Sequence, residues 1–319
     1  MLLKDFIRHG TDALSALYDA DEARSMVLYY CSEVFGYPSY QHITEPGTEV
    51  PADLLESAVE DMRRLSASEP LQYVLGYTEF CGRNFAVDER ALIPRGETEV
   101  LCQKAVEMLA ADAGNDKLRF LDLCTGSGCI AWTLAMDMPG SQVVATDISP
   151  DALALASSQF GGRDYVPGWT GRLPKRVKRP IFLEADVLDV EGTSGAALSA
   201  VAAGSPLPDG GNDCRFHLLT ANPPYVMQSE KTEMRPNVLD WEPHVALFAP
   251  DRDPLAFHRA IALIALRTLA PDGKGIVEIN SELPEESVAV FTGAGLADVS
   301  IIPDYFDRPR FVSFRKQGE

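Results

Sequence analysis

The hydrophobic pattern of the chain changes near residue 118, and this change constrains the fold more than any other feature. Beyond it, short apolar segments typical of strands occur at 118–124, 142–148, 181–187, 216–221 and 274–279. Helical stretches separate most of them, at 128–138, 150–160 and 254–269. This alternation predicts a parallel sheet covered by helices on both faces. Two further strand candidates, 297–306 and 308–316, are close enough to pair antiparallel. The expected core is a doubly wound, seven-stranded α/β sheet.

The start of the chain has a different periodicity. Apolar residues such as Met26, Val27 and Tyr30 recur at three- and four-residue steps, which places them on one helical face. The stretch 52–65 repeats this pattern. We therefore expect a small helical domain over residues 1–77.

A segment of mixed character follows this helical domain. Residues 78–96 combine short apolar alternation with the polar sequence Asp88-Glu89-Arg90. This combination predicts a β-hairpin that turns at the polar residues and joins the helical domain to a second domain, 97–319.

The charge of the chain argues against a nucleic-acid binder. The 319 residues contain 28 Lys+Arg and 47 Asp+Glu, a formal net charge of −19. Phosphate contacts need clustered cations, so we expect no stable nucleic-acid binding. Within residues 1–85 the count is 6 Lys+Arg against 14 Asp+Glu, so the helical domain should have acidic faces.

The cysteines and the apolar runs indicate a compartment. Six cysteines are widely spread, with no Cys/His cluster at metal-ligand spacing, so we expect neither disulfides nor a metal site. The longest apolar run ends before Arg267 and is far shorter than the roughly 20 residues that span a bilayer. We expect a soluble, cytoplasmic protein with no membrane partner.

Two long connections interrupt the alternating pattern. Residues 161–180 carry six Lys or Arg and one acidic residue, which makes a basic patch on an acidic protein. Residues 191–214 are rich in Ala, Gly, Ser and Pro, with room for one short helix. Both exceed the usual length of connections in such folds, so we interpret them as insertions.

The first segment with chemical character follows the first core strand. Residues 121–128 read Leu-Asp-Leu-Cys-Thr-Gly-Ser-Gly and lead into a helix. Gly126 and Gly128 would let the backbone approach a ligand, and Asp147 at the end of the second strand could accept hydrogen bonds from two ribose hydroxyls. The pattern indicates a nucleoside site, with a merely structural turn as the alternative. The spacing is neither that of a dinucleotide fingerprint nor that of a P-loop.

A further acid and a proline-rich loop follow the next two strands. Asp186 could accept a hydrogen bond from an adenine amino group with Val187 against the ring, although a solvated strand end explains the acid equally well. Asn222-Pro223-Pro224-Tyr225 comes directly after the fourth strand. The Asn222 side-chain oxygen and the Pro223 carbonyl can hold both hydrogens of a planar NH2 group, and Tyr225 can pack on the attached amide or ring.

These motifs, in this order, resemble a known family. The chain is similar to class I S-adenosylmethionine-dependent methyltransferases, with their Rossmann-like sheet. The segments at 69–80, 91–99, 241–248 and 307–316 narrow the resemblance to the peptide chain release factor N5-glutamine methyltransferases. Their helical N-terminal domain meets the release factor, so the resemblance implies that residues 1–77 recognise the substrate.

The resemblance also implies roles for individual residues. The S-adenosylmethionine pocket is expected to include Asp122, Cys124, Thr125, Gly126, Ser127, Gly128, Asp147, Asp186, Val187 and Asn222. The resemblance implies that four residues bind the glutamine side chain of the Gly-Gly-Gln motif of release factors and are also the catalytic residues: Asn222, Pro223, Pro224 and Tyr225. The chain departs from the family at three positions: Cys124 for the usual glycine, Gly96 for a proline, and Val187 for an aromatic residue.

Three other functions compete with methylation of a release factor. A nucleic-acid adenine N6-methyltransferase would use the same kind of loop, but the acidic charge disfavours it and only the 161–180 patch supports it. A glutamine methyltransferase acting on a ribosomal protein is the second competitor, and the 91–99 segment argues against it. A non-enzymatic binding module is the third, and the intact 222–225 loop disfavours it.

Overall fold

The computed structural model describes residues 1–112, 115, 117–160, 173–204 and 214–318. The chain forms two compact units. The N-terminal unit contains Met1–Thr78, Val87–Glu89 and Met234–Trp241, and the sheet unit contains the rest of the chain. The expected division into 1–77, 78–96 and 97–319 stays a prediction. Packing assigns the distant segment 234–241 to the N-terminal unit, which the sequence did not indicate.

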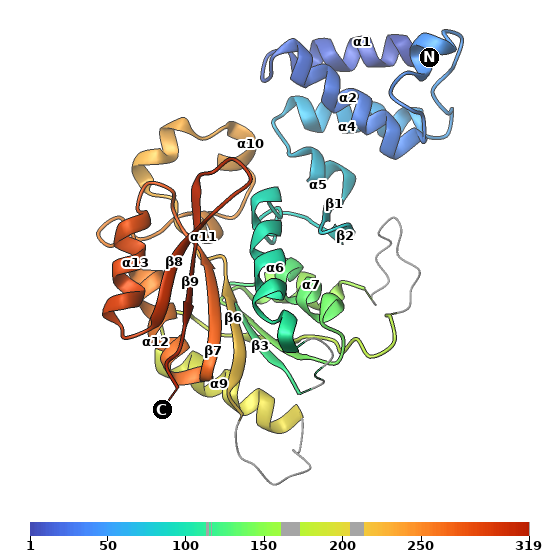
Figure 1. Cartoon of the computed structure of the whole chain (residues 1–319). Helices are drawn as coiled ribbons and strands as arrows, with labels where there is room; N and C mark the ends of the chain where they lie inside the picture. Colours follow the sequence, from blue (N-terminus) through green and yellow to red (C-terminus); the bar gives the residue numbers. More distant parts are fainter. Residues whose placement is uncertain (113–114, 116, 161–172, 205–213, 319) are drawn as a thin grey trace. The chain divides into compact units, whose positions relative to one another are not determined.

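The N-terminal unit is helical, as expected (Figure 1). Its longest helix begins after Asp19, whose side chain accepts a hydrogen bond from the Glu22 N–H, and ends at Gly36 in the left-handed conformation with φ +69°. The apolar faces of α1, α2 and α4 pack into one core. The helices are α1 (Leu3–Leu14), α2 (Ala20–Phe35), α3 (Gln41–Thr44), α4 (Leu55–Ser66), α5 (Leu71–Leu75) and the distant α10 (Pro236–Leu239).

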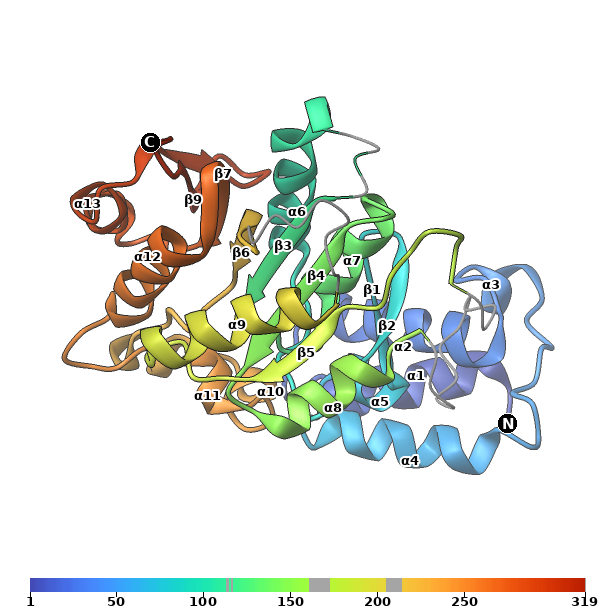
Figure 2. The same ribbon diagram turned by 90° about the horizontal axis from the view of Figure 1, so that it is seen from below.

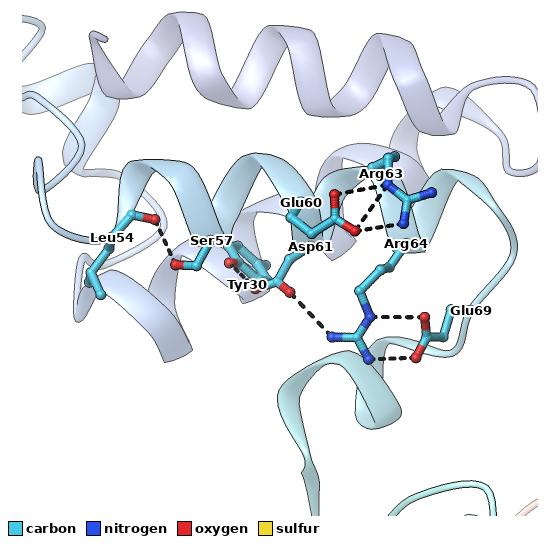
Figure 3. A network of polar contacts seen from close by, with 8 residues as sticks. All are labelled: Tyr30, Leu54, Ser57, Glu60, Asp61, Arg63, Arg64 and Glu69. Atoms are coloured by element: carbon cyan, nitrogen blue, oxygen red, sulfur yellow. Dashed lines mark hydrogen bonds and ion pairs between the residues drawn. The ribbon is translucent and has the colours of Figure 1, made fainter.

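A polar network joins three parts of this unit (Figure 3). Arg64 on α4 donates two parallel hydrogen bonds to Glu69, at 2.9 Å from Nε and 2.5 Å from Nη2. Its Nη1 lies 3.3 Å from Asp61 Oδ1, while Asp61 Oδ2 accepts a 2.6 Å hydrogen bond from the Tyr30 hydroxyl of α2. Glu69 is only 8% exposed, so its carboxylate depends on the guanidinium for its hydrogen bonds.

We predict that Arg64→Lys lowers the free energy of unfolding of the N-terminal unit by about 1–2 kcal/mol, because lysine keeps the charge but cannot make the paired hydrogen bonds. Arg63→Lys is the matched control, since its partner Glu60 is half exposed and solvent screens this pair, so this substitution should cost clearly less than Arg64→Lys. Hydrogen exchange of the α2 and α4 amides measures both. Equal effects of the two variants would contradict the prediction.

The hairpin is shorter than expected, and its turn lies elsewhere. The strands β1 (Tyr77–Phe80) and β2 (Arg83–Ala86) form a two-stranded sheet. The prediction that Asp88-Glu89-Arg90 forms the turn is wrong. Cys81 and Gly82 make it, both with left-handed backbones, at φ +50° and +68°, which suits a two-residue hairpin turn.

The sheet unit contains the expected seven-stranded sheet, in the order β5-β4-β3-β6-β7-β9-β8. Five neighbouring strands, β5 to β7, are parallel, and the last two pair antiparallel, as predicted. Because β4 and β5 extend the sheet to one side of β3 and β6 to the other, the strand order reverses between β3 and β6. The strands are β3 (Arg119–Leu123), β4 (Gln142–Asp147), β5 (Ile181–Glu184), β6 (Phe216–Ala221), β7 (Leu269–Glu278), β8 (Ala297–Pro303) and β9 (Pro309–Arg315).

Helices cover both faces of the sheet, which confirms the doubly wound architecture (Figures 1 and 2). Alternating strand residues serve the two faces: Phe120 packs with α6 and α7, whereas Leu121 packs with α9 and α12. The helices of this unit are α6 (Gly96–Met108), α7 (Cys129–Asp137), α8 (Pro150–Ser158), α9 (Val190–Gly204), α11 (His244–Leu247), α12 (Ala256–Thr268) and α13 (Pro284–Gly293), with short 3-10 turns at Ala110–Asp112 and Gln228–Glu233.

The interpretation of 191–214 as an insertion is wrong over most of its length. The helix α9 occupies Val190–Gly204 and buries Ala197 and Val201 against the sheet. Its small residues, which resembled a loop composition, allow close packing on the strands. Residues 205–213 lie outside the described part.

Of the basic segment 161–180, residues 161–172 lie outside the described part of the chain, and residues 173–180 lie within it. Lys178 Nζ donates to the Gly140 carbonyl at 2.6 Å. Arg179 Nη2 donates to the Phe160 carbonyl at 3.2 Å, and its guanidinium lies over the Trp132 ring at 5.5 Å. These two cations therefore help to hold the segment on the sheet unit.

Throughout the described residues, the helices are too short or too polar to cross a membrane.

Candidate active site

A cleft lies at the carboxyl ends of β3 to β6, within the sheet unit. Its empty volume is about 1070 Å³, including space open to solvent. The loops after four strands contribute to its wall: Thr125 after β3, Asp147 at the end of β4, Asp186 after β5 and Asn222 after β6. Ligands of open parallel sheets bind at this edge, beside the point where the strand order reverses.

The glycine loop between β3 and α7 forms one wall of the cleft. Cys124, Gly126 and Gly128 all have left-handed backbones, with φ of +56°, +54° and +80°. At Gly126 a Cβ would meet no atom within 4 Å, whereas at Gly128 it would lie 2.9 Å from Ala156 Cβ. Gly128 does not line the cleft, so it is required for packing against α8, and Gly126 provides the open backbone.

Cys124 occupies its strained backbone without being glycine. It lines the cleft beside Thr125 and Ser127. Burial and the nearby carboxylates of Asp147 and Asp122 raise the pKa of its thiol well above the usual value. The thiol is therefore protonated at neutral pH and unsuited to act as a nucleophile.

Asp147 fixes the shape of the glycine loop. Its Oδ2 accepts a 2.8 Å hydrogen bond from the Gly126 N–H, and its Oδ1 accepts one of 2.9 Å from the Ser149 N–H. Burial raises its pKa, while these backbone donors oppose the rise. Each oxygen retains a further lone pair for a ligand hydroxyl in the cleft.

Asp122 lies behind the cleft and does not line it. It is fully buried, and its two oxygens accept hydrogen bonds from the Thr125 hydroxyl at 2.6 Å and the Thr220 hydroxyl at 2.8 Å. Burial raises the pKa of Asp122 to about 7, opposed by the two threonines. This carboxyl group joins β3, the glycine loop and β6.

We predict a pH-dependent cost from this burial. Because the pKa of Asp122 is raised in the folded state, that state holds a proton that the unfolded chain loses above about pH 4, and stability falls as the pH rises toward 7. Relative to Asp122→Asn, the wild type should lose up to about 1.4 kcal/mol of unfolding free energy per pH unit between pH 5 and 7. Urea unfolding at several pH values measures this difference. A difference that stays constant over this range would contradict the prediction.

Asp186 and Val187 lie where the chain leaves β5. The strand pairs with β4 only as far as Glu184, so the following residues turn away from the sheet and line the cleft. Asp186 Oδ1 accepts a 2.8 Å hydrogen bond from the Leu188 N–H. Val187 is 6% exposed and forms an apolar wall with Ile148 and Leu188.

Within the 222–225 loop, Asn222 and Pro224 line the cleft, whereas Pro223 and Tyr225 do not. The Tyr225 hydroxyl is turned to Glu278 Oε1, at 2.9 Å. The Tyr225 carbonyl accepts a 3.1 Å hydrogen bond from Asn280. The loop is thus held by the strand beside it.

The sequence did not reveal an ion pair that closes another side of the cleft. Glu242, 3% exposed, accepts hydrogen bonds from the Arg95 guanidinium at 2.5 Å and from the Ile93 N–H at 3.1 Å. Arg95 lines the cleft. This ion pair connects the segments 91–99 and 241–248. Both segments contributed to the family resemblance in the sequence, but the sequence did not indicate that they are in contact.

A second missed pair lies under Asn222. Glu278 is 1% exposed and accepts a hydrogen bond from the Thr98 hydroxyl at 2.8 Å, as well as the one from Tyr225. Burial raises the pKa of Glu278, while the two hydroxyl donors and the charge of Arg310 oppose the rise. Asn222 Nδ2 lies 3.3 Å from the Thr98 oxygen.

Comparison with known proteins agrees with this arrangement. The family described as the PrmC N-terminal domain matches residues 5–76. The chain is 33% identical over 301 residues to a release factor glutamine methyltransferase of Bacteroides thetaiotaomicron, covering 94% of this chain and 95% of the relative.

The chain belongs to the release factor glutamine methyltransferase family. A relative with the same name from Chlorobaculum tepidum is 33% identical, with 96% of this chain and 95% of the relative covered. Another, from Flavobacterium psychrophilum, is 30% identical, with 98% of each chain covered. The match thus includes both the helical unit and the sheet unit, and the sheet has the class I methyltransferase order of strands. None of the described residues forms a group of three or more His, Cys, Asp or Glu that could hold a metal ion.

Proposed function

We propose that this enzyme methylates the side-chain nitrogen (N5) of the glutamine in the Gly-Gly-Gln motif of peptide chain release factors, with S-adenosylmethionine as methyl donor. Membership of the family supports the reaction class and the substrate. The observation that carries the proposal is the position of the Asn222 amide in the wall of a cleft that also has nucleoside-binding character. Residues 1–77 are proposed to recognise the release factor, which the family match at 5–76 supports.

The chemistry of the cleft residues fits S-adenosylmethionine. Asp147 has acceptor capacity for the two ribose hydroxyls, and Asp186 for the adenine amino group. Val187 and Ile148 offer apolar surface to the adenine ring, and the backbone of Cys124 to Ser127 lies open to the cleft. We propose these residues as the cofactor site, with Gly128 and Asp122 shaping it from behind.

The proposed chemistry depends on orientation of the acceptor. S-adenosylmethionine supplies, when bound, an electrophilic methyl group on a sulfonium. An amide nitrogen is a weak nucleophile because its lone pair is delocalised into the carbonyl. Asn222 Oδ1 accepts an N–H hydrogen of the substrate amide, holds the nitrogen for in-line attack, and stabilises the positive charge that develops on it. The Pro223 carbonyl was expected as the second acceptor, but Pro223 does not line the cleft. The surplus proton leaves to water after transfer.

A cytoplasmic location follows from this proposal. Release factors act at ribosomes, and all six cysteines are free thiols, as a reducing compartment allows.

The proposed substrate is tested by transfer of labelled methyl groups. Purified release factor should be labelled, whereas the same factor with alanine in place of the glutamine of its Gly-Gly-Gln motif should not be. DNA, RNA and ribosomal proteins serve as further substrates in parallel. Label on nucleic acid would favour adenine methylation, and label on a ribosomal protein would favour the other glutamine methyltransferase; either result without label on the factor would overturn the proposal.

We predict that Asn222→Ala lowers kcat by about 100-fold or more, the usual effect of removing a group that stabilises transition-state charge. Binding of S-adenosylmethionine should stay measurable by calorimetry, because most of the proposed cofactor contacts lie on other loops. Asn115→Ala, at an exposed residue outside the cleft wall, is the control. Full activity of the Asn222 variant would refute the proposed role of this residue.

A further inference from the structure

Two hydrogen bonds join Asn222 through Thr98 to a buried carboxylate, and a third holds this carboxylate to Tyr225; Asn222 and Thr98 both line the cleft. The Thr98 hydroxyl donates to Glu278 Oε2 at 2.8 Å, and the Tyr225 hydroxyl donates to the other oxygen at 2.9 Å. Asn222 Nδ2 is 3.3 Å from Thr98 Oγ1. The four residues come from α6, β7 and the loop after β6, so folding brings together groups up to 180 positions apart in the chain.

The direction of these bonds is fixed by the groups themselves. The Thr98 hydroxyl has one hydrogen, which it donates to Glu278 Oε2, and the positive charge of Arg310 favours the ionised, accepting form of this carboxyl group. Because Thr98 gives that hydrogen to Glu278, its oxygen offers only lone pairs to Asn222. The asparagine must therefore turn its NH2 toward Thr98, which leaves Oδ1 for the cleft.

We propose that Thr98 and Glu278 are positioning residues that hold the Asn222 amide with its oxygen toward the substrate. This inference rests on the proposed function and deepens it. An acceptor at this point binds an NH2 group and repels a carboxylate, so the chain of hydrogen bonds selects glutamine over glutamate at the methylated position. The selection uses a repulsive contact as well as an attractive one.

The surroundings make this arrangement rigid. Thr98 is 2% exposed in the first turn of α6, and Glu278 is 1% exposed. Glu278 is paired with Phe311 in the antiparallel ladder of β7 and β9. Arg310 Nη1 lies 3.4 Å from the Tyr225 hydroxyl and places positive charge beside the carboxylate. A buried network of this kind has little freedom to reorient.

The kinetic test compares two substitutions at Thr98. Thr98→Val keeps the shape and removes the hydroxyl, and kcat for release factor should fall about 10- to 100-fold, as for a misplaced catalytic group. Thr98→Ser restores the hydroxyl and should be within about threefold of wild type, because the hydrogen bonds can re-form. Thr268→Val is the matched control, since it removes another buried threonine hydroxyl, one that donates to the Ile264 carbonyl within α12. Its kcat should equal that of the wild type.

Two further readouts separate positioning from a merely structural role. A release factor with glutamate in place of the glutamine should inhibit the Thr98→Val enzyme more strongly than it inhibits the wild-type enzyme. Without the Thr98 hydroxyl, the Asn222 side chain can turn its NH2 group toward the carboxylate of this glutamate. The second readout is hydrogen exchange of the Asn222 side-chain amide, followed by NMR in protein with 15N-labelled asparagine side chains. The Asn222 signal is assigned by its absence in Asn222→Ala. Its hydrogens should exchange with solvent faster in Thr98→Val than in the wild-type enzyme. The exchange measurement needs no substrate, so it decides the amide orientation even if release factor is not methylated and the proposed function fails.

Glu278→Gln tests the other end of the chain. The new glutamine amide can donate to the Thr98 oxygen and free the threonine hydrogen, so Thr98 no longer fixes the orientation of the Asn222 amide and kcat should fall. The double variant Thr98→Val/Glu278→Gln should then be no slower than Thr98→Val alone, because both substitutions break the same chain of hydrogen bonds. Independent losses in the double variant would overturn the inference. A Thr98→Val enzyme with the kcat of the wild type would also overturn the inference. The same holds for a Thr98→Val enzyme that is slow but is inhibited by the glutamate-containing release factor, and exchanges its Asn222 amide hydrogens, as the wild-type enzyme does.

Discussion

Two buried carboxylates, each held between a pair of hydroxyl groups, organise the candidate active site. Asp122 is held by Thr125 and Thr220, and Glu278 by Thr98 and Tyr225. Burying a carboxylate is unfavourable unless its oxygens are satisfied, so each one dictates where its hydroxyl partners must lie. The glycine loop, the 222–225 loop and the start of α6 are thereby placed with respect to the same sheet.

The sequence predicted the parts of this site that are local in the chain. The glycine turn, Asp147 and the 222–225 loop each follow a strand directly, so the strand pattern alone brings them to one edge. The contacts of Arg95 with Glu242 and of Thr98 with Glu278 could not be predicted in this way. Their partners lie 147 and 180 positions apart, and neither residue type is unusual at its place. Only packing of the complete sheet unit brings them together.

The errors in the predicted elements have local causes. The strand β7 begins at Leu269, earlier than its apolar run suggests, because Pro271, Asp272 and Gly273 resemble a turn. The structure accommodates them through an irregular register with β6 and a left-handed Asp272, φ +60°. In α9 the small residues that suggested a loop serve close packing instead. In both cases tertiary contacts outweigh local propensity.

The segment 234–241 has a consequence for modularity. The chain passes between the two units five times, after residues 78, 86, 89, 233 and 241. Arg235 in this segment bonds to Glu22 of α2 at 2.5 Å, so the N-terminal unit combines the first part of the chain with an internal segment whose contact residue lies 213 positions further on. A protein that began after Thr78 would retain Met234–Trp241 without the helices on which it packs. The N-terminal unit is therefore not a separable module. If it were exchanged for another domain by a single gene fusion at the hairpin, residues 234–241 would remain without the helices against which they pack.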